Sequence, residues 1–328
     1  MTMNYERSSV PTSNKVAQVV SLGHDCAGID AVSVALNMLN IDVEYEFASE
    51  VNRSCVKQIM SHYPPKTIYG DIRSRKIAHM KSVDLYVCGF PCVPFSHLGK
   101  REGINNENCG DVVFGALNYI KQKKPKNFVL ENVSGFATSG NGDLCQEIVE
   151  ELKSLDVYSI FIEYLNAEDY GIPQSRKRLF IIGIPKGKQL QPFQKEKRKK
   201  LDEFLDLTAA NPKEHTPSST IALKLIQDKV KDDPSFDIEN NYHIIDLGVS
   251  KGYAHKGRLG ICPCLKTRSE RYYVPRLKRF IWSKEALALQ GFPPSWQSVC
   301  SECSTFKQAG NSMCVPVLMA IFRSMCLI

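Results

Sequence analysis

The chain lacks the features of a membrane protein and those of a secreted, disulfide-stabilised one. None of its apolar runs approaches the length of a membrane span, about 20 residues, and the polar residues 1–15 contain no signal-peptide core. The 12 cysteines follow no framework spacing and many lie in apolar segments, which favours free thiols in a reducing compartment. We therefore expect a soluble protein with no membrane partner, nuclear if its source is eukaryotic and cytoplasmic otherwise.

Strong net charge and internal repeats are absent as well. The 42 Lys and Arg residues exceed the 35 Asp and Glu residues by seven, an excess that permits a polyanionic partner without requiring one. Hydrophobic residues make up 43% of the chain and charged residues 23%, which is ordinary for a globular protein. Its 328 residues suffice for one large domain or two moderate ones.

Strand and helix signals alternate along the first half of the chain. Helical patterning follows Asp30, which can cap a helix after a tight loop over residues 23–28. We expect further helices over 111–121 and 144–155, and strands over 16–22, 43–50, 83–88, 127–130, 157–165 and 179–184. This alternation predicts an α/β fold with a doubly wound, mostly parallel sheet that carries helices on both faces.

The alternation stops at Pro185. Residues 185–240 are charged and loop-rich, and helical patterning returns from Ser283 onward. We therefore expect one domain over residues 16–184 that is completed by 283–328, and a smaller second domain over 185–282. The basic run over residues 195–200 indicates either a solvated face or linker, or a contact to phosphates.

A cysteine in a proline-rich turn is the most informative feature of the sequence. Cys92 lies in the segment GFPCVPFS, residues 89–96, directly after the strand expected over 83–88. Ligands and reacting groups collect at the carboxyl ends of strands in open α/β sheets. Most cysteines are small buried hydrophobes, but a thiol held at a strand end by two prolines is placed as a nucleophile. We therefore expect Cys92 to be catalytic.

Charged side chains follow the neighbouring strand signals. Glu131, in the segment ENV over 131–133, ends the strand expected over 127–130, so we expect it on the same sheet rim as Cys92. Arg176 and Arg178 lie two residues apart just before the strand expected over 179–184, so they face the same side of an extended chain. The sequence thus predicts a thiol, a carboxyl group and two guanidinium groups at one site.

Further motifs lie near the end of the chain. The segment GNS, residues 310–312, is expected to open the last apolar helix, where backbone N–H groups are free to bind a ligand. With the segments EALALQGFP over 285–293 and QAGNS over 308–312, the motifs follow the order of the cytosine-5 DNA methyltransferases that use S-adenosylmethionine. The sequence resembles this family over almost its whole length. The resemblance implies a Rossmann-like catalytic domain over 16–184 and 283–328, and a target recognition domain over 185–282.

The resemblance implies that the chain transfers the methyl group of S-adenosylmethionine to C5 of cytosine in DNA. Because C5 is a poor nucleophile, the Cys92 thiolate would first add to C6 of the ring. Glu131 would balance the ring by holding a proton near N3, which requires a raised carboxyl pKa in a dry pocket. Arg176 or Arg178 would favour the thiolate and hold the base O2. The target base must leave its stack to reach such a pocket.

The resemblance also implies a cofactor site at the same sheet edge. The segment DCAGID, residues 25–30, resembles the family's first glycine motif, which lies against the methionine moiety. Glu50 suits the ribose hydroxyls, and Asp71 resembles the position that accepts from the adenine amino group. Asn311 would help to close the methionine end. The full set of expected cofactor contacts is Ala27, Gly28, Ile29, Glu50, Asp71, Ile72, Gly89, Pro91, Asn311 and Ser312.

Two positions depart from the family's pattern. Val93 stands where the family has glutamine, which removes a polar side chain that helps to hold DNA around the flipped base. Asp30 stands where the family has glycine, which puts the close approach of the cofactor there in question. Neither departure removes the thiol, the carboxyl group or the arginines. We therefore expect a competent enzyme with altered substrate handling.

Two alternatives stay open. The tRNA cytosine-5 methyltransferases share these motifs, and the segment SKGY over 250–253 faintly resembles their signature. A catalytically inactive nucleic-acid-binding paralogue would also fit the two departures. We expect a monomer whose partner is DNA, with RNA as the alternative.

No metal is expected, although the segments CPC over 262–264 and CSEC over 300–303 together hold four thiols. The first pair has a one-residue spacing with a proline between the cysteines, which does not suit a zinc site. His24 and His97 flank the expected site in the sequence. We expect both to be exposed loop histidines.

Overall fold

The computed structural model describes residues 19–91, 112–137, 142–208, 240–248, 258–268 and 271–327, and single positions or short runs at 224, 226–228, 230–231 and 237. Three sequence-based expectations, on Cys92, Val93 and His97, lie outside these described residues, as does the segment 250–253. In the part of the chain that the structure describes, no helix is long and apolar enough to cross a membrane, and no group of three His, Cys, Asp or Glu side chains could hold a metal ion.

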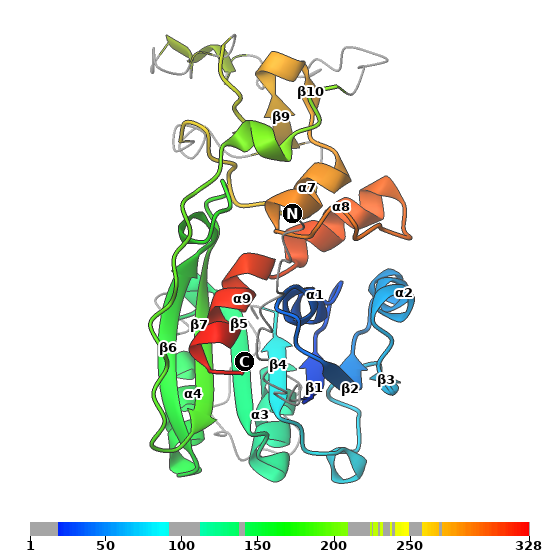
Figure 1. Cartoon of the computed structure of the whole chain (residues 1–328), viewed down its shortest axis with the longest axis vertical. Helices are drawn as coiled ribbons and strands as arrows, with labels where there is room; N and C mark the ends of the chain where they lie inside the picture. Colours follow the sequence, from blue (N-terminus) through cyan, green and yellow to red (C-terminus); the bar gives the residue numbers. More distant parts are fainter. Residues whose placement is uncertain are drawn as a thin grey trace, which may run out of the picture.

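The central element is a seven-stranded sheet in the order β3-β2-β1-β4-β5-β7-β6 (Figure 1). The strands β3, β2, β1, β4 and β5 are parallel, whereas β7 is antiparallel to both of its neighbours. The expected doubly wound, mostly parallel sheet is therefore confirmed. The strands are β1 (Val20–Asp25), β2 (Val43–Ser49), β3 (Thr67–Tyr69), β4 (Leu85–Gly89), β5 (Asn127–Val133), β6 (Tyr158–Asn166) and β7 (Lys177–Pro185).

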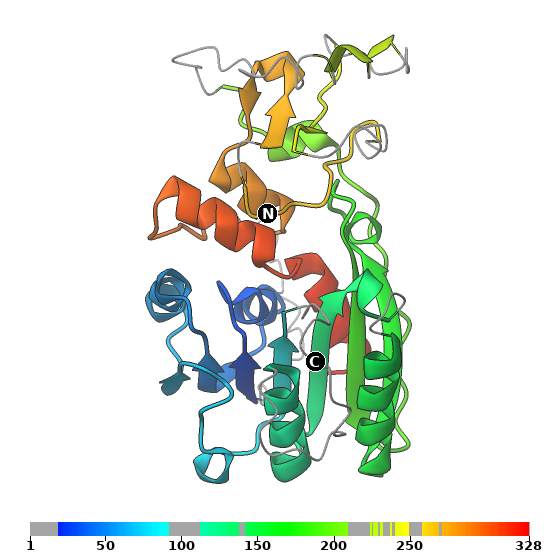
Figure 2. The same cartoon turned by 180° about the vertical axis from the view of Figure 1, so that it is seen from behind.

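Helices cover both faces of this sheet, as Figures 1 and 2 show from opposite sides. Residues of α1 (Ala31–Met38) and α9 (Val315–Ser324) share one buried apolar core with one face of the strands. Residues of α3 (Val112–Lys123) and α4 (Gly142–Ser154) share a second core with the other face. Successive residues of β4 alternate between the two cores, because side chains of a strand alternate between its faces.

A smaller antiparallel sheet lies in the second part of the chain, in the order β10-β9-β8. Helices α7 and α8 connect this sheet to α9 along the chain (Figure 1). The remaining elements are α2 (Arg53–His62), β8 (Ile245–Asp246), β9 (Tyr272–Val274), β10 (Arg279–Phe280), α7 (Ser283–Leu289) and α8 (Glu302–Asn311), with 3-10 turns η1 (Ile77–His79), η3 (Ser134–Ala137), η4 (Ala167–Asp169), η5 (Leu201–Phe204) and η7 (Pro275–Leu277).

The start of the expected loop over residues 23–28 was placed wrongly. Gly23, His24 and Asp25 continue β1, and the turn begins at Cys26. Gly23 is a close-approach position, because a Cβ atom there would overlap the ring of Phe47 on β2. His24 is consequently buried, with 1% of its surface exposed, so the expectation of an exposed loop histidine is wrong.

The place of the motif over residues 310–312 also differs from the expectation. Gly310 and Asn311 end α8, and α9 begins only at Val315, with a proline in its first turn. A Cβ atom at position 310 would overlap the backbone of Lys266, so this glycine lets α8 approach the segment 265–267. The motif therefore lies at the end of one helix instead of opening the next.

Candidate active site

A cleft of about 480 Å³ lies at the carboxyl ends of β1, β2, β4 and β5. A much smaller cavity of about 30 Å³ adjoins it and shares several lining residues. Of the predicted site residues, the cleft is lined by Gly28, Glu50, Asp71, Ile72, Gly89, Pro91, Glu131, Arg176, Arg178 and Asn311, and the small cavity also by Ala27 and Ser312.

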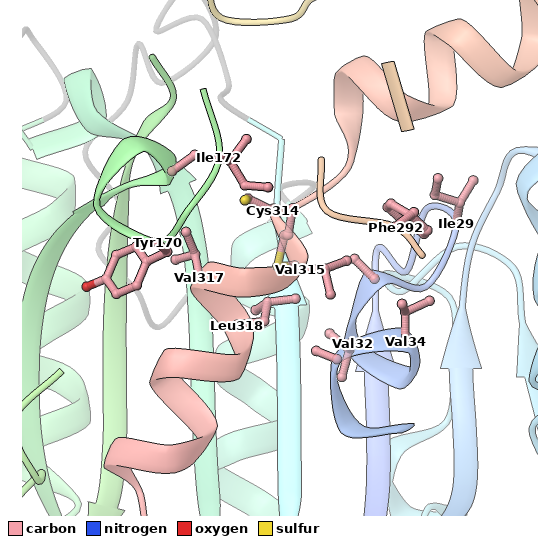
Figure 3. Packing of buried hydrophobic residues seen from close by; sticks show 14 of the residues in the cluster. Ile29, Val32, Val34, Tyr170, Ile172, Phe292, Cys314, Val315, Val317 and Leu318 are labelled. Atoms are coloured by element: carbon pink, nitrogen blue, oxygen red, sulfur yellow. The ribbon is translucent and has the colours of Figure 1, made fainter. Parts of the chain in front are cut away.

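Ile29 does not join this set. Its side chain is 2% exposed and belongs to the apolar core beneath α1 and α9, where Figure 3 shows it close to Phe292. Cys92 lies outside the described residues, but Pro91, the residue directly before it, lines the cleft. The structure thus gathers the other predicted residues at one sheet edge, where open α/β sheets bind ligands.

Glu131 contributes a carboxyl group to the cleft from β5. It pairs in register with Gly89 of β4, and Oε1 lies 3.2 Å from Nε of Arg178 on β7. Burial raises the pKa of Glu131 above its ordinary value, and this effect outweighs the opposing influence of Arg178 and Arg176. The group is therefore inclined to keep a proton that it can share with a ligand.

The two arginines have different surroundings. Arg176 is 3% exposed, and its guanidinium group donates to the carbonyl oxygens of Leu265, Gly310 and Ser312 at 3.1, 3.1 and 2.6 Å. Arg178 instead faces the Glu131 carboxylate and is partly exposed. Arg176 thus joins α8 to the segment 262–268, whereas Arg178 leaves part of its charge available to the cleft.

Asp30 adopts the backbone conformation for which glycine is favoured, with φ at 62°. Its buried carboxylate accepts from the N–H of Ser33 at 3.3 Å and lies 2.9 Å from Nδ1 of His24. Asp30 is not among the residues that line the cleft. The departure from glycine is therefore accommodated by a helix cap and a buried partner, and it does not obstruct the cleft.

Two carboxylates at the far end of the cleft are held by neighbours. Glu50 accepts from the backbone N–H groups of Gly28 and Asn52 at 2.8 and 2.7 Å. Asp71 accepts from Arg73 through both carboxylate oxygens, and these bonds, with an N–H bond from the same residue, lower its pKa below the ordinary range. Both side chains are thus held as oriented acceptors.

The comparisons with known proteins agree with this geometry. The model of the C-5 cytosine-specific DNA methylase family matches residues 20–326. The chain belongs to this family. It is 30% identical over 311 residues to the Type II methyltransferase M.NlaX of Neisseria lactamica, covering 91% of this chain and 94% of that protein. It is also 30% identical over 285 residues to M.BsuFI of Bacillus subtilis, covering 85% of this chain and 66% of that protein.

Solved structures share the fold. A mutant DNMT2 of Spodoptera frugiperda superposes with a TM-score of 0.65 at 15% identity, covering 93% of this chain and 99% of that one. The Dnmt2 methyltransferase of S. pombe gives a TM-score of 0.62 at 16% identity, covering 93% and 98%. Identities this low show the fold alone. The predicted family and the enzyme class of a DNA cytosine-5 methyltransferase are confirmed by the family match and the Type II relatives.

Sequence reasoning missed a buried ion pair behind the end of the cleft that holds Glu50 and Asp71. The guanidinium group of Arg75 pairs with Asp25 at the end of β1 and donates to Oγ of Ser49 at the end of β2 at 3.0 Å. It also lies 5.6 and 5.4 Å from the ring centroids of Phe47 and Tyr119. Arg75 therefore fastens the loop that carries Asp71 and Ile72 to the strand ends. Arg73, Arg75 and Lys76 lie close together in this loop, and nothing in the sequence marks Arg75 as the one that is buried.

Cys264 is a second residue that sequence reasoning missed. Its Sγ lies 3.6 Å from guanidinium nitrogens of both Arg176 and Arg178. Burial alone would raise the pKa of this thiol, but the two arginines outweigh burial and lower it below the ordinary 9.0. Only the fold brings residue 264 to the arginines, so the sequence could not reveal this contact.

We expect Cys264 to be alkylated with a pH midpoint below that of an ordinary thiol. Iodoacetamide labelling followed by peptide mass spectrometry, from about pH 6 to about pH 10, would measure that midpoint. Removing one guanidinium group in Arg178→Met should move the midpoint upward. A midpoint at or above the ordinary value in the wild type would contradict the assigned contact.

Proposed function

We propose that this chain methylates C5 of cytosine in DNA through a transient bond between Cys92 and C6 of a flipped base. The observation that carries the proposal is Glu131, a carboxyl group only 12% exposed, with a raised pKa, that faces Arg178 inside the cleft. Pro91, the residue directly before Cys92 in the chain, lines the same cleft. A thiol, a protonated carboxyl group and a guanidinium group are the set that this chemistry needs.

The residues around the cleft fit S-adenosylmethionine as the methyl donor. Gly28 and Gly70 line the cleft, and among the described residues, apart from their chain neighbours, no atom lies within 4 Å of where their Cβ atoms would be, so a ligand can approach the backbone there. Glu50 accepts two backbone N–H bonds and keeps further lone pairs for the ribose hydroxyls. Asp71 and Ile72 would contact the adenine, and Asn311 the methionine end. When bound, S-adenosylmethionine supplies the electrophilic methyl group that C5 accepts.

The protein's own groups would prepare the base. The Cys92 thiolate forms a bond to C6, and Glu131 shares its proton with N3 so that negative charge does not build up on the ring. This makes C5 nucleophilic. Once C5 carries the methyl group, a base removes the C5 proton, the bond between sulfur and C6 breaks, and the thiolate is restored. Arg178 would stabilise the negative charge that Glu131 gains when it gives up its proton. Arg176 would keep the segments that carry Leu265, Gly310 and Ser312 in place beside the cleft.

We assign the catalytic domain to residues 16–184 and 283–328, and target recognition to residues 185–282. The three-stranded sheet of β8, β9 and β10 supports this division, since it is separate from the central sheet. Part of the basic run is already paired, because Arg198 and Lys195 contact Glu168 and Asp169. Lys199 and Lys200 are exposed and remain the stronger candidates for phosphate contacts.

Methyl incorporation tests this proposal directly. Labelled S-adenosylmethionine is offered to the full chain together with either duplex DNA of mixed sequence or tRNA. We expect label in the DNA at cytosine C5 and none in the tRNA. Cys92→Ala should reduce incorporation to background, because alanine has no sulfur that could bond to C6.

A second cysteine variant controls for effects of removing any thiol from the chain. Cys303 is exposed, is not among the residues that line the cleft, and Cys303→Ala should keep full activity. Label in tRNA alone would show the tRNA alternative to be right. Undiminished activity in Cys92→Ala would remove the proposed nucleophile, and no incorporation into either nucleic acid would favour a binding protein.

A further inference from the structure

His24 occupies an unusual position at the end of β1. It is 1% exposed, and its Nδ1 lies 2.9 Å from Oδ1 of Asp30. Its other ring nitrogen, Nε2, is buried and has no hydrogen-bond partner among the described residues. Oγ of Ser33 shares this condition. Buried polar atoms without partners are rare in folded proteins, so each one indicates a water or ligand as its partner.

The surroundings of His24 indicate where that partner lies. His24 lines the small cavity of about 30 Å³ together with Ala27, Asn311 and Ser312. This cavity shares Gly28, and also Cys26, Gly89, Glu131 and Asn311, with the main cleft. A ligand in the cleft therefore needs only a short polar extension to reach the imidazole. A single water would fill most of the cavity in the absence of such a group.

The partner of His24 must suit its tautomer. Because the Asp30 carboxylate accepts a hydrogen bond, it selects the form of the ring that carries its proton on Nδ1. When the ring carries this one proton, Nε2 presents a lone pair. The negative charge of Asp30 behind the ring makes this lone pair attractive to a cationic donor and unattractive to an anion.

We propose that Nε2 of His24 accepts a hydrogen bond from the α-ammonium group of S-adenosylmethionine, and that Asp30 orients the ring for this contact. The inference rests on the proposed function, because it assigns a further binding residue to the same cofactor. It gives a role to the departure at position 30. His24 is thus a ligand-contacting residue and Asp30 a positioning residue.

Two ligands that differ only at the amino-acid end test the contact by calorimetry. S-adenosylhomocysteine carries the α-ammonium group, whereas 5′-methylthioadenosine lacks the whole amino-acid end. We expect His24→Asn to lower the affinity for S-adenosylhomocysteine by about tenfold to a hundredfold and to leave the affinity for 5′-methylthioadenosine unchanged. Asparagine tolerates positive φ, so Asp30→Asn should keep the local backbone. It should lower the affinity for S-adenosylhomocysteine by a smaller factor than His24→Asn does.

The control is His79→Asn, at an exposed histidine that does not line either cavity, and it should change neither affinity. Thermal unfolding of each variant separates loss of the contact from loss of the fold. An equal weakening of both ligands, or no weakening of either, would overturn the inference while leaving the proposed function intact. A wild-type chain that binds neither ligand would overturn both.

Discussion

Replacing Glu131 by glutamine should lower kcat by about 10²- to 10⁴-fold, the usual effect of losing a general acid. The glutamine amide can still accept from Arg178 and can donate an N–H hydrogen bond, but it has no acidic proton to transfer to N3 of the base. Glutamine has nearly the shape of glutamate, so the cleft and the small cavity that Glu131 lines keep their form, and the affinity for S-adenosylhomocysteine should change far less than kcat. Single-turnover methylation of DNA and calorimetric binding would measure the two quantities.

The chain offers a matched control for this substitution. Glu163 on β6 and Glu131 on β5 pair in register with the same residue, Phe180 of β7, from opposite sides. Burial raises the pKa of Glu163 as well, yet this residue is not among those that line the cleft. Glu163→Gln should therefore keep wild-type kcat. Equal losses in the two variants would show that Glu131 matters only for the sheet.

The pH dependence of the unfolding free energy should separate the chemical role of Glu131 from a structural one. The pKa of Glu131 is raised in the folded state, so its contribution to the free energy of unfolding is present at low pH and is lost as pH rises through the folded value. Glutamine does not titrate. The wild-type chain should therefore lose stability relative to Glu131→Gln as the pH is raised from acid to neutral. Urea titrations of both proteins at the two pH values would measure this change in relative unfolding free energy.

Substituting the two arginines by methionine should give opposite phenotypes. Arg176→Met leaves three buried carbonyl oxygens without their donor, at about 1–3 kcal/mol each, which is a large fraction of a typical folding free energy of about 5–15 kcal/mol. Arg178→Met removes the charge that faces Glu131, so kcat should fall by about 10²- to 10³-fold with a much smaller loss of stability.

Urea unfolding and steady-state methylation of the same two preparations would test this division. Methionine keeps most of the side-chain volume in both variants, so differences in packing stay small. If Arg176→Met unfolds at the wild-type urea concentration while Arg178→Met is strongly destabilised, the assigned roles are reversed. Recovery of stability in Arg176→Lys is not expected, because one ammonium group cannot reach three diverging carbonyl oxygens as a planar guanidinium group does.

Much of the fold was predictable because its signals are local. Apolar runs bounded by polar turns gave β2, β4, β5, β6 and β7 to within a few residues, and period-3.6 patterning gave α3 and α4. Helix α2 was not predicted, although Asn52 caps it through bonds from the N–H groups of Ser54 and Cys55. The N-cap preference of asparagine was an available signal, and the apolar residues Cys55, Val56, Ile59 and Met60 recur at helical spacing, so this helix could have been predicted.

The candidate site was predictable for the same reason, since strand ends carry Glu50 and Glu131 into the cleft. What the sequence could not reveal depends on contacts between distant segments. The role of Arg176 is set by carbonyl groups more than 85 positions away, at residues 265, 310 and 312. Likewise, the sequence predicts that Gly310 opens a helix. Its actual role depends on the backbone of Lys266, which lies too close to Gly310 for a side chain to fit.

The central claim is that the Cys92 sulfur bonds to C6 of a cytosine, and trapping that bond tests it most directly. Duplex DNA containing 5-fluorocytosine has fluorine where the C5 proton would leave, so the covalent complex cannot resolve after methyl transfer. With S-adenosylmethionine present, the wild-type chain should migrate with the DNA on a denaturing gel, and peptide mapping should place the bond at Cys92. Migration of the wild-type chain as free protein, or an equal adduct in Cys92→Ala, would contradict the account.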